Sequence, residues 1–371
     1  MFGVKHKSGH SPDYFFLALV FVLTIFGLVM LSSASSELGK IKFNDSYYYL
    51  KHQLMSGLLV GALGFFVFYK LNYGYLKKFS LPFLIFCLGL LALVFTKFGV
   101  SGGGATRWLR FGPLIFQPAE LLKLAFVIYL AAWLSNPRVQ RGKSFVEGFL
   151  PFLVVSGFMA ALLILQPATS MVVILVGAGV AVYFLSGLKL KYLFMIIAIG
   201  LIGLTLIVLF TPYRMARVVG FFKGEKDSQG SGYHLNEALL AMGSGGLGGV
   251  GFGDSRTKTS YLPAPIDDSI FAVTGEELGF VGAGSLVAIF GLLVFRVFWI
   301  SRFIRDQFGQ LLIIGFASII AIQSIINISA ISGLMPITGV PLPFISYGGT
   351  ALAVFLSMCG IIGNVSKFTR Q

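Results

Sequence analysis

The stretch YFFLALVFVLTIFGLVML, residues 14–31, carries no charged side chain. An α-helix needs about 20 mainly apolar residues to cross the hydrocarbon core of a bilayer. Although Ser32-Ser33-Ala34 resembles a cleavage site, the run is longer than the apolar part of a signal peptide, and many more apolar runs follow it. We therefore expect residues 14–31 to stay in the protein as the core of a first membrane-spanning helix.

The rest of the chain has the same character. Its 371 residues are 56% hydrophobic and 11% charged, whereas a soluble domain is about 45–50% apolar and about 25% charged. The sequence predicts an all-α, polytopic membrane protein with a single integral membrane domain over residues 1–371. The ten expected spans lie at about 14–34, 53–69, 80–97, 119–135, 150–165, 169–187, 191–211, 270–295, 310–331 and 346–366.

The basic residues indicate how these spans are oriented. A net charge of +14 could indicate nucleic-acid binding, but the basic residues form short clusters between apolar runs instead of one basic face. One side of the spans receives Lys5, Lys7, Lys70, Lys77, Lys78, Arg138, Arg141, Lys143, Lys189, Lys191, Arg296, Arg302, Arg305, Lys367 and Arg370. The positive-inside rule then places both termini in the cytoplasm and the long loop of about residues 212–268 outside.

That outer loop ends in PIDDSIFAVTGEE, residues 265–277, which holds four of the chain's 14 acidic residues. Asp267 and Asp268 directly precede an apolar helix, where an aspartate can cap the helix N-terminus. A cap needs only one carboxylate, and carboxylates beside a membrane are costly unless they are used. Because an apolar boundary raises the pKa of a carboxyl group, the alternative role is a general base.

Two further sets of charged residues lie near the same outer boundary. Glu276 and Glu277 fall within the eighth span, and Glu276 shares a helix face with Asp268 because eight residues separate them. Glu120 and Lys123 lie three residues apart at the start of the fourth span and can pair on one face. Each set either forms structural ion pairs or lines a cavity beside Asp268.

Two glycine-rich segments lie in the outer loops. Residues 102–110 (GGGATRWLR) combine mobile glycines with Arg107 and Arg110, which suit phosphate recognition, while Trp108 suits an interfacial anchor. Residues 246–251 (GLGGVG) match the pattern GxGxxG, but the absence of a βαβ unit argues against a dinucleotide site. We expect this second segment to form a flexible hinge or a backbone nest for a phosphate.

Residues 333–350 (GLMPITGVPLPFISYGGT) join the last two spans. Three prolines and four glycines give an irregular backbone at membrane depth, which is tolerated only against protein or a wet cavity. The segment carries no charge. We therefore expect a re-entrant loop that shapes the substrate site, with Ser346, Tyr347 and Gly348 in contact with substrate.

Three segments together carry a family resemblance: GLMPITGVPLPFISYGGT, FQPAELLKLAFVIYLAAWLS at 116–135 and YLPAPIDDSIFAVTGEELGFVG at 261–282. They resemble the SEDS family, the FtsW, RodA and SpoVE proteins, over nearly the whole chain. The resemblance implies a glycosyltransferase that polymerises lipid II at the outer face of the bacterial cytoplasmic (inner) membrane. It also implies a class B penicillin-binding protein, which crosslinks the strands, and other divisome or elongasome membrane proteins as partners.

The resemblance also implies roles for single residues. The family's essential aspartate, in a pattern like YLP-x-x-x-x-D-x-IFA, falls on Asp268, and Asp267 stands where the family usually has a small polar residue. The family pattern QPSE-x-x-K ends on Lys123, with Ala119 in place of serine. The family's QPDLGT reads QPATS here, which puts Ala168 in the place of an acid, so no role is carried over for that acid.

The implied reaction is attack of a sugar hydroxyl on an anomeric carbon while a lipid pyrophosphate leaves. We expect Asp268 to take the hydroxyl proton, so that a one-step displacement inverts the anomeric centre. We expect Arg107, Arg110 or Lys123 to stabilise the leaving pyrophosphate. A bound divalent cation such as Mg²⁺ or Mn²⁺ is an alternative source of that charge. The apolar spans can supply a groove for the polyprenyl tail.

Three alternatives to an FtsW-like division enzyme stay open. The GEELGFVG and IYLAAWLS segments favour the FtsW-like branch over a RodA-like elongation polymerase. A lipid II flippase without chemistry needs charge along a path through the bilayer, whereas these charges gather at its outer boundary. A scaffold that only recruits the transpeptidase has no need of Asp268, Glu120 and Lys123.

Overall fold

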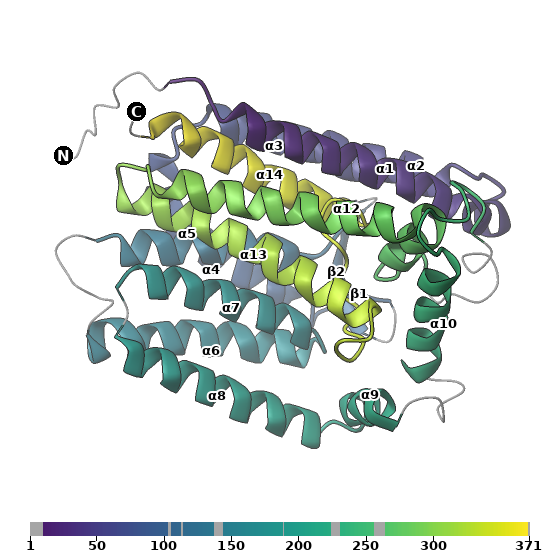
Figure 1. Ribbon diagram of the computed structural model, residues 1–371. Coiled ribbons are helices and arrows are strands. Elements are labelled where there is room, and N and C mark those ends of the chain that lie inside the picture. Colours follow the sequence, from purple (N-terminus) through teal and green to yellow (C-terminus); the bar gives the residue numbers. More distant parts are fainter. Residues whose placement is uncertain are drawn as a thin grey trace.

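The computed structural model describes residues 10–102, 105–112, 114–136, 144–187, 189–223, 231–255 and 264–369. Its long helices run side by side as one bundle, and both chain ends lie at the same end of it (Figure 1). There the N–H of His10 donates to the Lys367 carbonyl at 3.0 Å. Several residues used above lie outside the described residues: Lys5, Lys7, Gly103, Gly104, Arg138, Arg141, Lys143, the YLP residues 261–263 and Arg370.

The expected all-α membrane fold is confirmed. The helices are α1 (Tyr14–Phe43), α2 (Tyr48–His52), η1 (Gln53–Leu59), α3 (Val60–Lys70), α4 (Gly74–Leu93), α5 (Pro118–Leu134), η3 (Phe145–Phe149), α6 (Leu150–Leu165), α7 (Thr169–Leu185), α8 (Leu190–Leu209), α9 (Pro212–Lys223), α10 (Ser231–Ser244), α12 (Ile270–Ser301), α13 (Gln307–Ile331), α14 (Gly349–Val365) and η5 (Ser366–Phe368).

Within the described residues, eight helices are long and apolar enough to cross a membrane. They are α1, the run from α2 to α3, α4, the run from η3 to α6, α8, α12, α13 and the run from α14 to η5. The expected fourth and sixth spans coincide with α5 and α7, which have 17 residues each. The first span is longer than expected, because α1 continues to Phe43 and ends at Asn44 in the left-handed conformation.

The core of the bundle is built around α13, which packs against α5, α7, α12 and α14. Most residues of α5 are buried, as a helix that is apolar on nearly all sides requires. At the periphery, α8 exposes most of its apolar side chains, which is the behaviour of a helix that faces lipid. The buried ion pair of α5 and the two amide side chains of α13, described below, therefore lie on enclosed helices.

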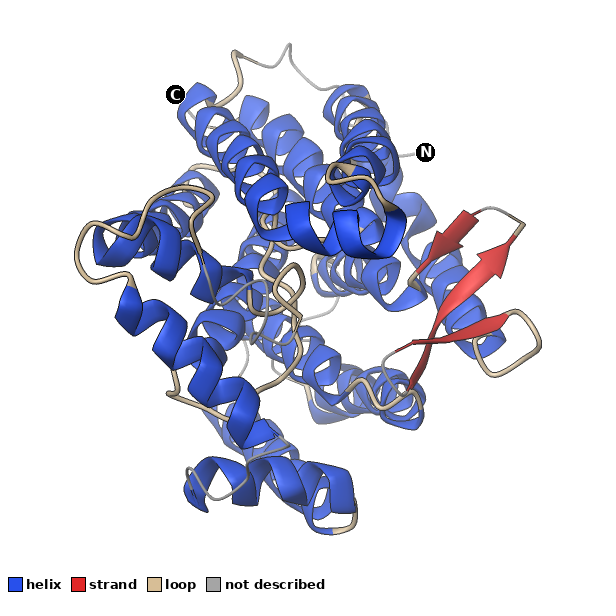
Figure 2. Ribbon diagram, turned by 90° about the vertical axis from the view of Figure 1, so that its right-hand side faces the viewer, coloured by secondary structure: helices blue, strands red, loops and turns tan. Residues whose placement is uncertain are grey.

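The end of the bundle opposite the chain ends carries the structured parts of the outer loops. It holds α9 and α10, which belong to the expected loop of residues 212–268 (Figure 1). Between α4 and α5 the chain forms an antiparallel sheet in the order β1 (Gly99–Gly102), β2 (Ala105–Phe111) and β3 (Leu114–Phe116). Figure 2 shows this sheet at one edge of the molecule. The expected mobile loop is thus a small sheet, because alternating side chains such as Phe98, Phe111 and Phe116 stack across it.

Candidate active site

Asp267 and Asp268 lie in the turn directly before α12. The side chain of Asp268 is only 8% exposed. Its Oδ2 atom lies 3.9 Å from the point that a β-carbon on Gly339 would occupy, so the carboxylate faces the loop of residues 333–348. The N-cap position of α12 is Ser269, not Asp268. The capping alternative therefore does not account for the buried carboxylate.

Both carboxyl groups of this turn titrate unusually high. Burial raises the pKa of Asp268 to about 6, although backbone N–H groups and the positive charge of Arg217 favour the charged form. The side chain of Asp267 reaches solvent, yet the surrounding protein raises its pKa to about 6 as well, and the charge of Asp268 acts in the same direction. A carboxyl group that titrates near neutrality suits a general base.

Two of the three loop residues expected to touch substrate fasten the aspartate turn to the re-entrant loop of residues 333–348. Ser346 donates its hydroxyl to the Asp267 carbonyl. Tyr347 donates its backbone N–H to the Ile266 carbonyl at 2.8 Å. These bonds fix the position of the turn relative to the loop.

The end of α2 and the start of η1 hold the same loop from the other side. Gln53 accepts the N–H of Gly348 at 3.0 Å and donates to the Ser346 carbonyl at 3.4 Å. The Tyr347 hydroxyl lies 2.8 Å from His52 Nδ1, and burial raises the pKa of this tyrosine. Gly348 thus serves through its backbone in the contacts that the structure describes.

Two amide side chains on α13 support the loop and the turn together. Gln323 donates to the Pro341 carbonyl at 2.8 Å. One turn later, Asn327 donates to the carbonyls of Val340 at 2.7 Å and Asp268 at 2.8 Å. Irregular backbone at membrane depth needs such partners. Neither amide was predicted from the sequence, although two amide side chains four positions apart in an apolar run indicate a polar contact on one helix face.

Glu120 and Lys123 form a fully buried ion pair on α5. The Lys123 ammonium donates to both carboxylate oxygens, at 2.9 and 2.8 Å, and to Gln323 Oε1 at 2.7 Å. It also lies 5.0 Å from the centre of the Phe355 ring. Of the two alternatives, this geometry favours the structural ion pair, because the ammonium group has three oxygen partners and no exposed surface. Through Gln323 the pair supports the loop that faces Asp268.

Glu276 and Glu277 contact other parts of the bundle. Ser255 donates to Glu276 Oε2 at 2.5 Å, and Ser33 of α1 donates to Glu277 Oε1 at 2.6 Å. Both glutamates are buried inside the described structure. They tie α12 to α1 and to the segment that follows α10. The expectation that Glu276 binds substrate beside Asp268 stays a prediction, and these contacts favour the structural alternative.

The glycine-rich segment of residues 246–251 repairs a break in α12. The helix is interrupted at Gly279, whose φ of 67° and ψ of −168° are not helical. Four hydrogen bonds of 2.9–3.2 Å cross the break, from the N–H of Val250 to the Glu276 carbonyl, Gly251 to Glu277, Phe280 to Gly246 and Val281 to Leu247. The expected phosphate nest is therefore wrong for the N–H groups of Val250 and Gly251, because α12 carbonyls accept them.

The two arginines of β2 differ in their surroundings. Arg107 is half-buried and donates to the carbonyls of Gln166 at 3.2 Å and of Pro167, just before α7. Arg110 is exposed, and the register of β2 with β1 shifts at Arg107, which stands unpaired between Thr106 and Trp108. Arg107 points toward the bundle beside Ala168, because it donates to Gln166 and Pro167.

Arg107 belongs to a cluster of three arginines, one of which, Arg217, acts on Asp268. Burial lowers the pKa of Arg107, and the charges of Arg217 and Arg214 on α9 act in the same direction, which places the three side chains near one another. Arg217 donates to the Ile337 carbonyl at 3.2 Å, and its charge also acts on Asp268. Within the described residues, none of the three forms an ion pair with a carboxylate. The sequence analysis did not single out Arg214 or Arg217.

Sequence comparisons relate the chain to a single protein family. A family model described as a cell cycle protein, FtsW/RodA/SpoVE, matches residues 13–371. Stage V sporulation protein E of Bacillus subtilis (strain 168) is 36% identical over 362 residues, which are 97% of this chain and 98% of that protein. A probable peptidoglycan glycosyltransferase FtsW of Geobacter sp. (strain M18) is 34% identical over 359 residues, which are 96% and 97% of the two chains.

Solved structures give the same answer. The chain superposes with a TM-score of 0.77 and 28% identity on a chain of a peptidoglycan synthase complex that coordinates polymerization and crosslinking, covering 96% of this chain and 97% of that one. The rod shape determining protein RodA of Thermus thermophilus gives a TM-score of 0.70 and 28% identity, covering 97% and 98%. The chain therefore belongs to the FtsW/RodA/SpoVE family of membrane proteins.

Proposed function

We propose that this protein is a peptidoglycan glycosyltransferase that polymerises lipid II into glycan strands in the manner of FtsW. The observation that carries the proposal is the buried carboxyl group of Asp268, with a pKa of about 6. Arg217 acts on it and belongs to a cluster of three arginines that have no carboxylate partners in the described residues. The relatives named FtsW bear the same activity in their names.

Asp268 acts as the general base. Its carboxylate takes the proton of the acceptor sugar hydroxyl as the hydroxyl oxygen forms a bond to the anomeric carbon of the donor. The bond from that carbon to the pyrophosphate oxygen breaks in the same step, and the configuration at the carbon inverts. Asn327, Ser346 and Tyr347 position the aspartate turn for this step through its backbone and that of Ile266.

The arginine cluster binds the leaving pyrophosphate. Arg107, Arg214 and Arg217 supply fixed positive charge where negative charge develops, which stabilises the transition state more than the ground state. We do not assign Lys123 to this role, because three buried oxygen atoms already accept its hydrogen bonds. Mg²⁺ is usually held by one or two carboxylates together with substrate phosphates. A cation bound to Asp268 would keep this carboxylate from taking a proton, so in this proposal the arginines supply the charge.

The setting of the reaction follows from the bundle. We place the chain in the bacterial cytoplasmic membrane with Asp268 at the outer face, because the described basic clusters lie at the end that carries both chain termini. The lipid-facing apolar helices offer a surface for the polyprenyl tail. We expect a class B penicillin-binding protein as partner, in line with the synthase complex whose chain superposes on this one.

The experiment is gel-resolved polymerisation of labelled lipid II by the purified full chain, alone and with its cognate transpeptidase. Wild type is expected to give polymer, and Asp268→Ala none. Asp267→Ala is the matched control, because it removes the neighbouring carboxylate. No polymer from wild type even with the transpeptidase would move the assignment to a flippase or a scaffold. Polymer from Asp268→Ala would remove Asp268 from the mechanism.

A further inference from the structure

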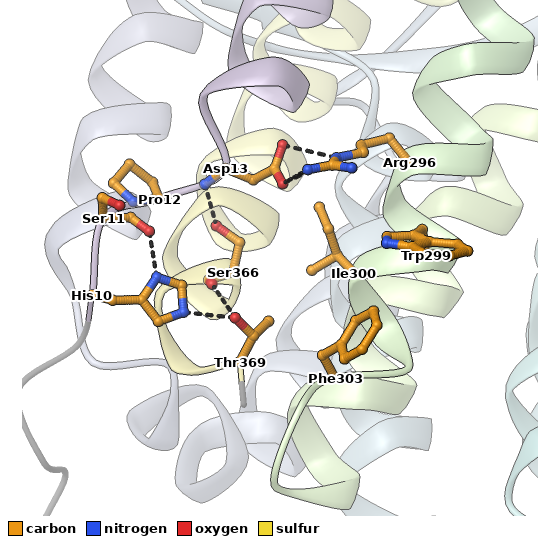
Figure 3. Close-up of a pocket in the computed structure, with 10 residues that line it drawn as sticks. All are labelled: His10, Ser11, Pro12, Asp13, Arg296, Trp299, Ile300, Phe303, Ser366 and Thr369. Atoms are coloured by element: carbon orange, nitrogen blue, oxygen red, sulfur yellow. Dashed lines mark hydrogen bonds and ion pairs between the residues drawn. The ribbon is translucent and has the colours of Figure 1, made fainter. Parts of the chain in front are cut away.

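A cavity of about 340 Å³ lies at the end of the bundle that carries both chain ends, opposite Asp268. Figure 3 shows its walls: His10, Ser11 and Thr369 on one side, Trp299 and Phe303 on the other, with Asp13 and Arg296 above. Its volume is within the range of about 300–1,000 Å³ that is usual for ligand sites. Nothing in the polymerisation mechanism uses this cavity.

The polar side of the cavity offers free hydrogen-bond donors on Arg296. Arg296 uses Nε and Nη2 for Asp13, at 2.6–3.2 Å, and its remaining Nη1 donors form no hydrogen bond within the described residues. The hydroxyls of Ser366 and Thr369 line the same wall, but Ser366 donates to the Gly363 carbonyl at 2.9 Å and Thr369 donates to His10. His10 Nδ1 faces the Ser11 carbonyl, which fixes a proton on this nitrogen, and Nε2 lies 2.6 Å from the Thr369 hydroxyl.

The other wall is aromatic and opens toward lipid. Trp299 is 43% and Phe303 is 41% exposed, and the rings of Phe295, Trp299 and Phe303 follow one another at 5.9–6.1 Å along one face of α12 and its end. Tryptophan in this position is typical of the membrane–water interface. Arg302 lies over the Trp299 ring at 5.7 Å and adds positive charge at the rim. The cavity is therefore at headgroup level, with an apolar wall on the lipid side and donors opposite.

We propose that this cavity binds the headgroup of an anionic glycerophospholipid from the adjacent leaflet. The phosphate accepts hydrogen bonds from the free Nη1 donors of Arg296, and the acyl chains leave past Trp299 and Phe303. Asp13 competes with the phosphate for Arg296, so this pair sets the affinity. Basic pockets between membrane helices are known binders of such headgroups.

Native mass spectrometry of the purified full chain, titrated with phosphatidylglycerol or phosphatidylcholine, tests the proposal. Wild type is expected to retain phosphatidylglycerol in preference to phosphatidylcholine. Arg296→Gln lowers the affinity for phosphatidylglycerol about tenfold, the effect of one hydrogen bond to a charged group. Asp13→Asn raises it, because the arginine is then released. Asp13→Asn/Arg296→Gln, which keeps the pair neutral and hydrogen-bonded, tests the loss in a chain without an unpaired charge.

Arg305→Gln is the matched control, since Arg305 is an exposed arginine nearby that does not line the cavity. Equal retention of the two lipids by wild type would overturn the proposal, as would a loss in Arg305→Gln equal to that in Arg296→Gln. Glycerol 3-phosphate and inorganic phosphate are titrated in parallel. If either displaces phosphatidylglycerol at equal concentration, the site recognises a soluble phosphate and the lipid assignment is wrong.

Discussion

Glu120 and Asp268 are both buried carboxylates near the same end of the bundle, yet their surroundings differ in kind. Both oxygens of Glu120 accept hydrogen bonds from Lys123. Asp268 forms no ion pair within the described residues, and the nearby Arg217 donates to a carbonyl instead. A carboxylate with a full set of partners is stable and unreactive, whereas one that burial leaves poorly compensated can take a proton.

The two carboxylates are nevertheless connected. The Lys123 ammonium bonds Gln323, which holds the loop at Pro341, and Asn327 holds the neighbouring Val340 together with the Asp268 carbonyl. The Glu120–Lys123 pair therefore positions the backbone around Asp268, the proposed base. A substitution at Asp268 should therefore lower the rate of polymerisation, whereas a substitution in the Glu120–Lys123 pair should lower the stability of the fold.

Asp268→Asn is expected to give the largest effect on chemistry. Polymerisation falls by about 10²–10⁴-fold, because asparagine accepts no proton. Stability at pH 7 does not fall. The pKa of about 6 lies above the ordinary 3.8, so burial of this group favours folding below about pH 4, and that contribution is lost as the pH rises through 6. Asparagine carries no charge to be penalised at pH 7.

Turnover assays and thermal unfolding of the same preparations check this prediction. Asp267→Asn serves as the control, since its side chain is open to solvent and is expected to retain most activity. A loss of folding in Asp268→Asn would instead assign this residue to the architecture.

Lys123→Met is expected to give the opposite pattern. It leaves the Glu120 carboxylate buried without its cation and lowers the free energy of unfolding by about 3–5 kcal/mol. Denaturant or thermal unfolding in detergent measures this loss. Glu120→Gln/Lys123→Met removes both charges and should recover part of it. Normal stability with lost turnover in Lys123→Met would contradict the comparison and return Lys123 to the substrate site.

Arg217→Gln tests how the charge beside Asp268 affects polymerisation. We expect polymerisation to fall about 100-fold, the effect of losing one preorganised donor to developing charge. In wild type, activity falls about tenfold per pH unit below pH 6 as the base is protonated. Because the charge of Arg217 lowers the pKa of Asp268, the variant should shift this midpoint upward.

The pH profile of turnover at saturating lipid II measures both effects of Arg217→Gln. Arg110→Gln is the control, because it removes an exposed arginine of β2. An unchanged midpoint in Arg217→Gln would show that this arginine does not act on the base.

Ala168→Asp is expected to give the smallest effect. Ala168 is the N-cap residue of α7 and makes no side-chain capping bond, so an aspartate there adds about 1 kcal/mol of stability. Ala168→Asn adds the cap without a charge, and the difference between the two variants in thermal unfolding reports the interaction with Arg107. Destabilisation by both variants would mean that this buried position does not accept a larger side chain.

The sequence predicted the membrane fold and the position of its charged segments, because apolar runs and charge clusters are local signals. Residues 14–31 and the aspartate turn needed no partner to be recognised. The sheet of residues 99–116 was not predicted, since its strands are short and β1 is glycine-rich. That Ser346 and Tyr347 contact substrate stays a prediction, and their bonds to the backbone of the aspartate turn were not predicted.

The rest of the site depends on contacts between segments far apart in sequence. Gln323 and Asn327 are polar side chains one turn apart in the apolar helix α13. The carbonyl groups to which they donate lie in two other segments, the re-entrant loop and the aspartate turn. Arg217 lies in α9 and donates to the re-entrant loop at Ile337, and from there its charge acts on Asp268. The roles of Glu276 and Lys123 were open because a single sequence does not show whether a buried charge has a partner.

The break at Gly279 divides α12 into two rigid rods, a short one before Gly279 and a long one after it. Residues 246–251 join the two rods as a splint does. The hydrogen bonds of the short rod next to Asp268 do not continue into the long rod that crosses the bundle, and four bonds to residues 246–251 carry the connection instead. A push or twist applied to the long rod therefore reaches the aspartate turn through this splint. A ligand or neighbouring protein that binds residues 246–251 would therefore change the position of the Asp268 side chain without contacting it.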